Sequence, residues 1–262
     1  MRVLHGRAGL GSEPIKELEH LNKLGLRLCE VAFTYSVYMN NEQAKIVGEA
    51  AKKNNITLTI HGQYFCNLAS KEKKKIEATK KRLLNALEVG HHLGAKYVVF
   101  HAAFYQGMDK EDVYKQVKEG VLEVEKIRKK NGWTTKLAAE TTGKGSQWGD
   151  LDEVIRLSKE TGIGFCVDFA HLYARDNGKI DYDLVFGKLK QFKEIHCHFS
   201  GINFTAKGER SHKVMDQDKI NELAKYFKKY GVSATITSES PETVEDAVRM
   251  KKAFEKIGIK SE

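Results

Sequence analysis

Proline is almost absent from this chain: its 262 residues include only Pro14 and Pro241, so no proline-rich linker divides it. No run approaches the roughly 18 uninterrupted apolar residues of a membrane span. The first residues also lack the long apolar segment of a secretory signal. We therefore expect a cytoplasmic protein without membrane association. A hydrophobic fraction of 41% and a charged fraction of 30% fit a globular protein and exclude collagen-like and low-complexity classes.

Cysteine is also scarce. Cys29, Cys66, Cys166 and Cys197 lie far apart without a C-x-x-C pair, which argues against a zinc knuckle or a thioredoxin motif. Three of the four lie in apolar runs. We interpret them as small buried side chains, not as metal ligands or disulfide partners.

Positive charge is in excess. Lys and Arg number 44 against 35 Asp and Glu, a net charge of +9 that favours polyanionic partners such as nucleic acid. The basic runs Lys71–Lys75 and Lys126–Lys130 lie inside helical patterns. We interpret these two runs as solvated helix faces.

One alternation repeats along the chain: a short apolar run, a polar loop, then an amphipathic stretch. The apolar runs are rich in Val, Ile, Leu, Thr and Phe, as buried parallel strands are; they span Arg2–His5, Leu26–Phe33, Ile56–His61, Lys96–His101, Lys136–Thr141, Ile163–Asp168, Glu194–Ser200 and Ser233–Ser240. The helical patterns span Glu13–Leu24, Asn41–Lys53, Lys71–His92, Lys110–Lys130, Asp150–Glu160, Tyr182–Gln191, Gln217–Tyr230 and Glu242–Ile257.

Eight strand–helix units match the size of a (β/α)8 barrel. A doubly wound sheet usually has fewer strands, and no G-x-G-x-x-G follows the first strand here. We therefore predict an α/β fold, a single (β/α)8 TIM barrel domain over residues 1–262. The active site of such barrels gathers at the C-terminal ends of the strands.

Six successive predicted strands carry an imidazole or a carboxylate at that end. The residues are His61, His101, Glu140, Asp168 with His171 in the following loop, His196 and His198, and Glu239. Carboxylates packed together without cations repel one another. Divalent metals remove that cost, and a His/Asp/Glu set suits zinc or manganese better than calcium.

Other histidines are assigned separately. His196 and His198 point to the same side of their strand, so one can coordinate metal while the other packs beside it or binds substrate. His212, in the long loop after the seventh strand, is another candidate ligand, and His5 is interpreted as a rim residue.

Together these residues resemble the endonuclease IV family of apurinic/apyrimidinic endonucleases, over essentially the whole chain. The segments that carry the resemblance begin at His61-Gly-Gln-Tyr-Phe, Phe100-His101, Ala139-Glu140-Thr-Thr-Gly, Cys166-Val-Asp168-Phe-Ala-His171, Ile195-His196 and Glu239-Ser-Pro241. The resemblance implies a (β/α)8 barrel that holds two or three zinc ions and cleaves DNA 5′ to abasic sites.

Residue by residue, the resemblance implies that His61 and His101 bind one zinc and that Glu140 bridges to a second. Asp168, His196 and Glu239 resemble ligands of the second ion, and His171 and His212 ligands of the third. Where the family has Asp-Arg-His, this chain has Glu209-Arg210-Ser211-His212. Glu209, like His198, is therefore a candidate metal or substrate ligand.

Tyr64 and Phe65 occupy the place where the family inserts side chains into DNA at the lesion. The implied reaction is metal-assisted hydrolysis of the phosphodiester, with Glu140 and Glu239 as catalytic residues. It leaves a 3′-hydroxyl and a 5′-deoxyribose phosphate. The expected partner is double-stranded DNA with an abasic site, and the expected state is a monomer.

Two alternatives stay open. A sugar isomerase or epimerase of the xylose isomerase-like barrels would use Glu140, Asp168, His196 and Glu239, but it leaves His61, His101, His171 and the positive charge unused. The second alternative is a DNA-binding protein with a degenerate catalytic centre, against which the three carboxylates count.

Overall fold

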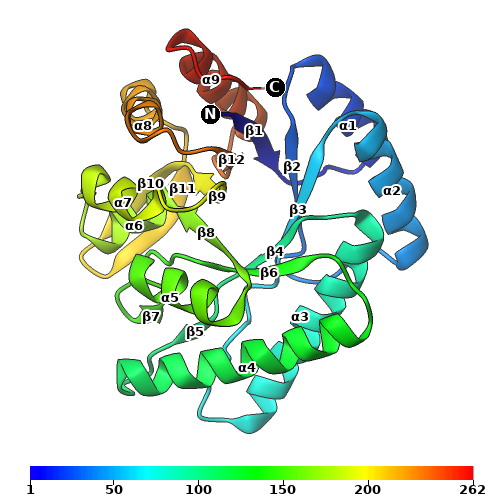
Figure 1. Cartoon of the computed structure of the whole chain (residues 1–262), viewed down its shortest axis with the longest axis vertical. Helices are drawn as coiled ribbons and strands as arrows, with labels where there is room; N and C mark the ends of the chain where they lie inside the picture. The colour runs from blue at the N-terminus through cyan, green and yellow to red at the C-terminus, as the bar shows by residue number, and fades with distance from the viewer. Residues whose placement is uncertain (262) are drawn as a thin grey trace.

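The computed structural model describes residues 1–261 and forms a closed barrel of parallel strands (Figure 1). In chain order the barrel strands are β1 (Val3–Ala8), β2 (Leu28–Ala32), β3 (Thr57–His61), β4 (Tyr97–Phe100), β6 (Lys136–Glu140), β8 (Gly164–Asp168), β9 (Ile195–Phe199) and β12 (Ala234–Ser238). Each pairs with the next, and β12 closes the ring on β1. The predicted single (β/α)8 barrel is confirmed.

Helices connect the strands and surround the barrel (Figure 1). They are α1 (Pro14–Lys23), α2 (Asn41–Lys53), α3 (Lys73–Leu93), α4 (Lys110–Lys130), α5 (Leu151–Thr161), α6 (Phe169–Arg175), α7 (Tyr182–Leu189), α8 (Gln217–Tyr230) and α9 (Thr243–Lys256). The eight predicted helices correspond to eight of these segments. The ninth segment, the short α6, was not predicted; it begins directly after β8.

Local sequence signals fix the helix ends. At the start of α5, the Asp150 side chain accepts a hydrogen bond from the Glu153 backbone, and the Glu153 side chain accepts one from the Asp150 backbone. This capping box satisfies two otherwise unpaired N–H groups. The helix ends at Gly162, whose φ of +79° is a left-handed conformation that favours glycine.

The core has an inner and an outer layer. Outward-facing strand residues such as Val98 and Val167 pack under the helices, while Val99, Ala138 and Cys166 fill the barrel interior. All four cysteines are free and buried, which confirms their interpretation as small core residues. Lys71–Lys75 are exposed, as expected of a solvated helix face.

The first strand is longer than the sequence predicted. It continues to Ala8 because Arg7, which interrupts the apolar run, turns outward and pairs with Glu17 at 2.6 Å. His5 therefore lies in the middle of the strand, buried, with its ring 4.6 Å from that of Phe254. Burial, aided by Lys251, lowers the pKa of His5 to about 3. The rim assignment of His5 was wrong; it is a neutral packing residue.

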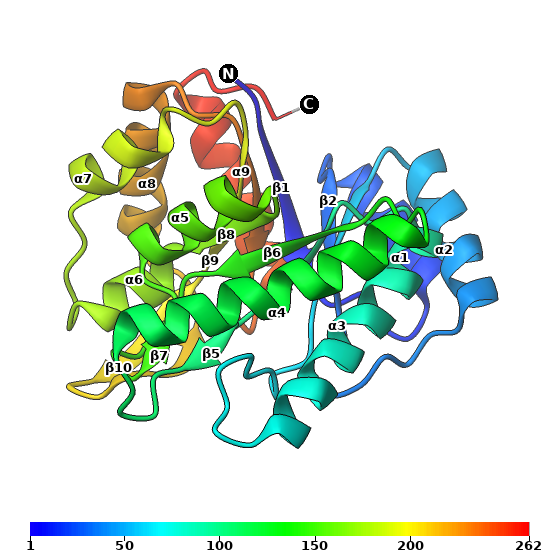
Figure 2. The same cartoon turned by 60° about the horizontal axis from the view of Figure 1, so that its bottom comes forward.

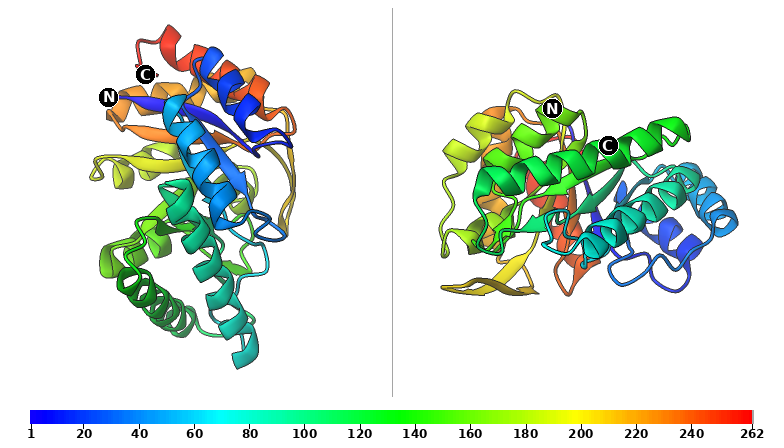
Figure 3. Two further views of the ribbon diagram at one scale, coloured as in Figure 1. Left: turned by 90° about the vertical axis from the view of Figure 1, so that its right-hand side faces the viewer. Right: turned by 90° about the horizontal axis from the view of Figure 1, so that it is seen from below.

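Two antiparallel pairs that the sequence did not predict extend the C-terminal end of the barrel. One joins β5 (Ala103–Phe104) to β7 (Gln147–Trp148), and the other joins β10 (Gly201–Thr205) to β11 (Gly208–Lys213). The yellow β10–β11 hairpin lies at the opposite end of the molecule from the two termini (Figures 2 and 3).

Within residues 1–261, no helix combines the length and the apolar character needed to cross a bilayer.

Candidate metal centre

Ionisable side chains from six strands meet at the C-terminal end of the barrel. Side chains alternate between the two faces of a strand, so residues two apart share the inner face. The inward residues at this end are His61 on β3, His101 after β4, Glu140 on β6, Asp168 on β8, His198 on β9 and Glu239 after β12. The structure therefore brings together the residues that the strand-end pattern singled out.

Glu140 lies at the centre of this cluster and is fully buried. Its Oε2 atom is 3.3 Å from Nε2 of His61 and 3.0 Å from Nε2 of His101. Its Oε1 atom is 2.9 Å from Nδ1 of His198. The two carboxylate oxygens therefore face different histidines, which is the arrangement that a carboxylate shared between two ions needs.

A second group surrounds the other oxygen of Glu140. Ligand atoms of Glu140, Asp168, His198 and Glu239 all lie within 4.8 Å of one another. Nδ1 of His198 is 3.4 Å from Oε1 of Glu239. Three carboxylates and one imidazole at this spacing can surround a single divalent ion.

A third group combines α6 with the β10–β11 hairpin. The Asp168 side chain accepts a hydrogen bond from the His171 backbone at 2.7 Å, which starts α6 and directs His171 into the mouth. Nε2 of His171 is 3.1 Å from Oε2 of Glu209. The rings of His171 and His212 are 5.8 Å apart. His171, Glu209 and His212 line one cavity of about 250 Å³ together with His61, His101 and Glu239.

A β-bulge explains how Glu209 and His212 reach the same side. Phe204 pairs with Glu209 and Asn203 with Ser211, so Arg210 is an extra residue in β11. A bulge moves the following side chains to the other face of the strand. The extra residue relative to the Asp-Arg-His pattern is thus accommodated at Arg210, and the bulge brings Glu209 and His212 to the same side of β11.

The two histidines of β9 occupy different layers. His198 reaches Glu140, whereas Nδ1 of His196 lies deeper, 2.8 Å from Oγ1 of Thr235. The resemblance gave the ligand position to His196, but in the structure it is His198 that contacts Glu140, because the two inward positions are one layer apart. Cys166 lies beside both, and burial holds the pKa of its thiol well above its usual range.

Sequence reasoning missed Glu30. This residue of β2 is fully buried inside the barrel, 3.0 Å from Nε2 of His198. It stands in the middle of an apolar run, in Leu-Cys-Glu-Val-Ala. A single carboxylate at an inward position of a buried strand was the available signal.

Charges within the cluster change the pKa values of its members. Burial lowers the pKa of His61, but the hydrogen bond and charge of Glu140 outweigh it and raise that pKa to about 9. The pKa of His171 also rises to about 9, because the charges of Asp168 and Glu209 outweigh burial. Burial, with the charge of Glu140, raises the pKa of Glu239. Without a metal, therefore, His61 and His171 carry protons that balance the carboxylates.

The donor set fits divalent metal. Four buried atoms that face the cluster have no hydrogen-bond partner of good geometry among residues 1–261: Nε2 of His101, Oε2 of Glu140, Oδ2 of Asp168 and Oε2 of Glu209. Leaving a buried polar atom unpaired costs roughly 1–3 kcal/mol. Coordination would satisfy these atoms, and mixed imidazole and carboxylate donors suit zinc or manganese.

Exposed aromatic side chains stand at the rim. Tyr64 lines the cavity and its ring lies 5.5 Å from that of His61. Tyr64 is 50% exposed and the adjacent Phe65 is 62% exposed. Tyr35, from the loop after β2, meets Tyr64 edge to face at 6.0 Å. The mouth therefore presents aromatic surface to the solvent.

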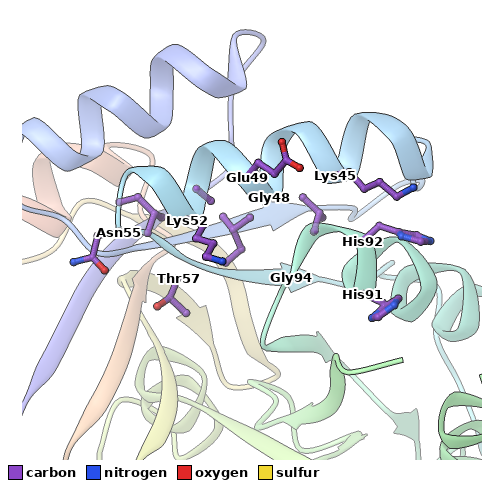
Figure 4. A pocket seen from close by; sticks show the side chains of 13 residues that line it. Lys45, Gly48, Glu49, Lys52, Asn55, Thr57, His91, His92 and Gly94 are labelled. Carbon is purple, nitrogen blue, oxygen red and sulfur yellow. The ribbon is translucent and has the colours of Figure 1, made fainter. Parts of the chain in front are cut away.

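A separate groove of about 530 Å³ lies between α2 and α3 (Figure 4). Lys45, Lys52, His91 and His92 border it, and Thr57 at the N-terminal end of β3 marks its floor. His91 and His92 are half-buried in the last turn of α3. The groove is at the opposite end of β3 from His61 and shares no residue with the metal centre.

Two relatives match most of the chain in sequence. The chain is 31% identical to an uncharacterized protein of Methanocaldococcus jannaschii, over 97% of this chain and 98% of that protein. It is 24% identical to a probable endonuclease 4 of Carboxydothermus hydrogenoformans, over 76% of each chain.

Solved structures share the fold more broadly. Endonuclease IV from Thermus thermophilus superposes with a TM-score of 0.69 at 20% identity, covering 98% of this chain and 100% of that chain. D-Psicose 3-epimerase from Clostridium cellulolyticum superposes with a TM-score of 0.68 at 14% identity, covering 98% of each. The family model described as xylose isomerase-like TIM barrel matches residues 18–199. With that match on a closed barrel whose mouth gathers histidines and carboxylates, the chain belongs to the xylose isomerase-like TIM barrel family.

Proposed function

We propose that this protein is a zinc-dependent endodeoxyribonuclease that hydrolyses the phosphodiester 5′ to abasic sites in DNA. The observation that carries the proposal is the size of the donor set. His61, His101 and Glu140 lie on one side of the cluster, and His171, Glu209 and His212 on the other. One ion needs only Glu140, Asp168, His198 and Glu239. The additional imidazoles and Glu209 therefore favour two or three ions.

Divalent ions at this site would supply Lewis acidity and lower the pKa of a coordinated water toward neutrality. Glu239 projects into the cavity and retains 14% side-chain exposure, so an attacking water can reach it. Its carboxylate would orient that water in line with the scissile bond and accept its proton. Glu140, whose two oxygens face different histidines, would help to hold the ions.

Several features suit an abasic duplex as substrate. The net charge of +9 favours the phosphate backbone. Tyr64 and Phe65 present exposed rings beside the cavity, where they would stack on bases next to the lesion. An abasic nucleotide lacks stacking of its own, which lowers the cost of turning it into the mouth. The products would be a 3′-hydroxyl and a 5′-deoxyribose phosphate, made by a monomer acting on DNA in the cytoplasm.

The test is incision of a duplex oligonucleotide with one abasic analogue, with product ends identified by mass. We expect a single cut 5′ to the lesion that a chelator abolishes and zinc, or manganese, restores. Binding without incision by the metal-loaded protein would favour a DNA-binding protein with a degenerate centre.

A sugar isomerase or epimerase is the second candidate. The observation that favours it is that Glu140, Asp168, His198 and Glu239 alone can surround one ion. It gives no role to Glu209 or His212. Interconversion of ketohexose epimers without any incision of abasic DNA would select this candidate.

A further inference from the structure

Deeper in the barrel than the proposed ligands, the Glu30 carboxylate contacts Nε2 of His198, the ring nitrogen that faces away from Glu140. Nε2 of His198 is 3.0 Å from Oε1 and 3.1 Å from Oε2 of Glu30. Oε2 also accepts a hydrogen bond from Oγ1 of Thr59 at 2.9 Å. All three side chains are buried inside the barrel. A carboxylate in such a place requires a permanent positive or hydrogen-donating partner.

The ring of His198 is oriented opposite to those of His61 and His171. Nδ1 of His61 is 2.9 Å from the Gly62 carbonyl, and Nδ1 of His171 is 2.9 Å from the Thr141 carbonyl. Both therefore present Nε2 to the carboxylates. His198 presents Nδ1 to Glu140, and its Nε2 faces away from the mouth.

From this geometry we infer that Glu30 is a positioning residue. It accepts a hydrogen bond from Nε2–H of His198 and so keeps Nδ1 free, aimed at the ion that Glu140, Asp168 and Glu239 would surround. The inference rests on the metal centre of the proposed function, and it names the nitrogen of His198 that coordinates. A carboxylate behind an imidazole raises its basicity as a ligand and fixes its tautomer.

His196 is not a substitute for this contact. Its Nε2 is 3.4 Å from Oε2 of Glu30, and its Nδ1 is 2.8 Å from Thr235. It packs against the same carboxylate from the layer below, so Glu30 connects that layer to the ligand. Without Glu30, the imidazole of His198 would be free to rotate about its Cβ–Cγ bond.

The experiment measures metal affinity in Glu30→Ala and Glu30→Gln. Zinc dissociation constants come from chelator competition, and the visible absorption of the cobalt-substituted protein reports ligand geometry. We expect Glu30→Ala to weaken zinc binding about 10- to 100-fold, the usual effect of losing such a partner, and to change the cobalt spectrum. Glu30→Gln keeps an oxygen that accepts from Nε2–H, so it should restore the wild-type spectrum and most of the affinity.

Glu125→Gln is the matched control. Glu125 is also a buried carboxylate, but it pairs with Arg128 on α4, outside the barrel. It should lower thermal stability without changing zinc affinity or the cobalt spectrum. Equal affinities and spectra for wild type and Glu30→Ala would overturn the inference, as would an equal loss of affinity in Glu125→Gln.

A second measurement needs no variant. In zinc-loaded protein with ¹⁵N-labelled histidine, long-range nitrogen–proton spectra distinguish coordination through Nδ1 from coordination through Nε2. We expect His198 to be bound through Nδ1 with a protonated Nε2; coordination through Nε2 would overturn the inference. Neither measurement uses DNA, so failure to incise abasic DNA would reject the proposed function while leaving the role of Glu30 intact.

Discussion

Oε2 of Glu209 lies 3.1 Å from Nε2 of His171, although the two residues come from a hairpin and a helix that the sequence did not predict to meet. Glu209 is held there by its backbone: its N–H donates to the Gly143 carbonyl at 3.1 Å. The loop that carries Gly143 is held in turn by Arg175, which donates to the Lys144 and Gln147 carbonyls at 2.7 and 3.0 Å. The third ligand group thus depends on contacts between loops.

Gly143→Ala should remove one metal equivalent. A Cβ at position 143 would collide with Oε2 of Glu209 and displace it from His171. We expect Gly143→Ala and Glu209→Gln each to bind one equivalent of zinc fewer per chain than wild type, measured by elemental analysis after gel filtration. Gly145→Ala is the matched control, because a Cβ there has open space. Full occupancy in Gly143→Ala would contradict the role of Glu209.

Metal affinity should rise with pH between about 6.5 and 9. In the metal-free cluster the pKa values of His61 and His171 are raised to about 9, whereas coordination needs neutral imidazoles. Zinc binding at pH 7.5 should therefore release protons, which calorimetry in buffers of different ionisation enthalpy measures. An affinity independent of pH across this window would count against the two histidines as ligands.

The same two histidines make the stability of the metal-free protein fall with pH, whereas metal affinity rises. Their pKa values are higher in the folded state than in the unfolded chain, so their contribution to stability is complete below about pH 6.5. That contribution is lost as the pH rises through about 9. Urea denaturation of the chelator-treated protein should show stability falling from pH 6.5 to 9. His61→Asn should reduce this dependence.

The sequence predicted the barrel well because each strand and helix carries its own periodic pattern and stop signals. It also identified the cluster, since a ligand at a strand end needs only the strand to be placed correctly. Alternation assigns His196 and His198 to the same face and cannot say which layer reaches Glu140, so the choice of His196 rested on the resemblance alone. Glu30 escaped because its partner His198 lies 168 residues further along the chain, and the bulge at Arg210 escaped because the pairing of β10 with β11 was not predicted.

Glu239→Gln should abolish incision while sparing DNA affinity. The substitution keeps the size of the side chain but removes the carboxylate that would accept the proton of the attacking water. Loss of such a group typically costs about 10²–10⁴-fold in rate. Single-turnover incision measures the rate, and fluorescence anisotropy with an abasic duplex measures binding. Glu242→Gln, an exposed residue three positions later, is the control that should retain full activity. An active Glu239→Gln enzyme would contradict the assignment.

Tyr64→Ala and Phe65→Ala should weaken the preference for abasic over intact duplex more than they weaken binding to intact DNA. The two rings are exposed at the rim, and only at a lesion is there a gap for them to enter. Stacking of an aromatic side chain on a base is worth about 1–3 kcal/mol, so we expect roughly a tenfold loss of the preference for each variant. Anisotropy titrations with matched abasic and intact duplexes at one salt concentration measure it. Leu184→Ala, which removes an exposed apolar side chain from α7, should leave the preference unchanged. If both aromatic variants keep the full preference, the lesion is recognised by the metal cavity itself and not by the rings at its edge.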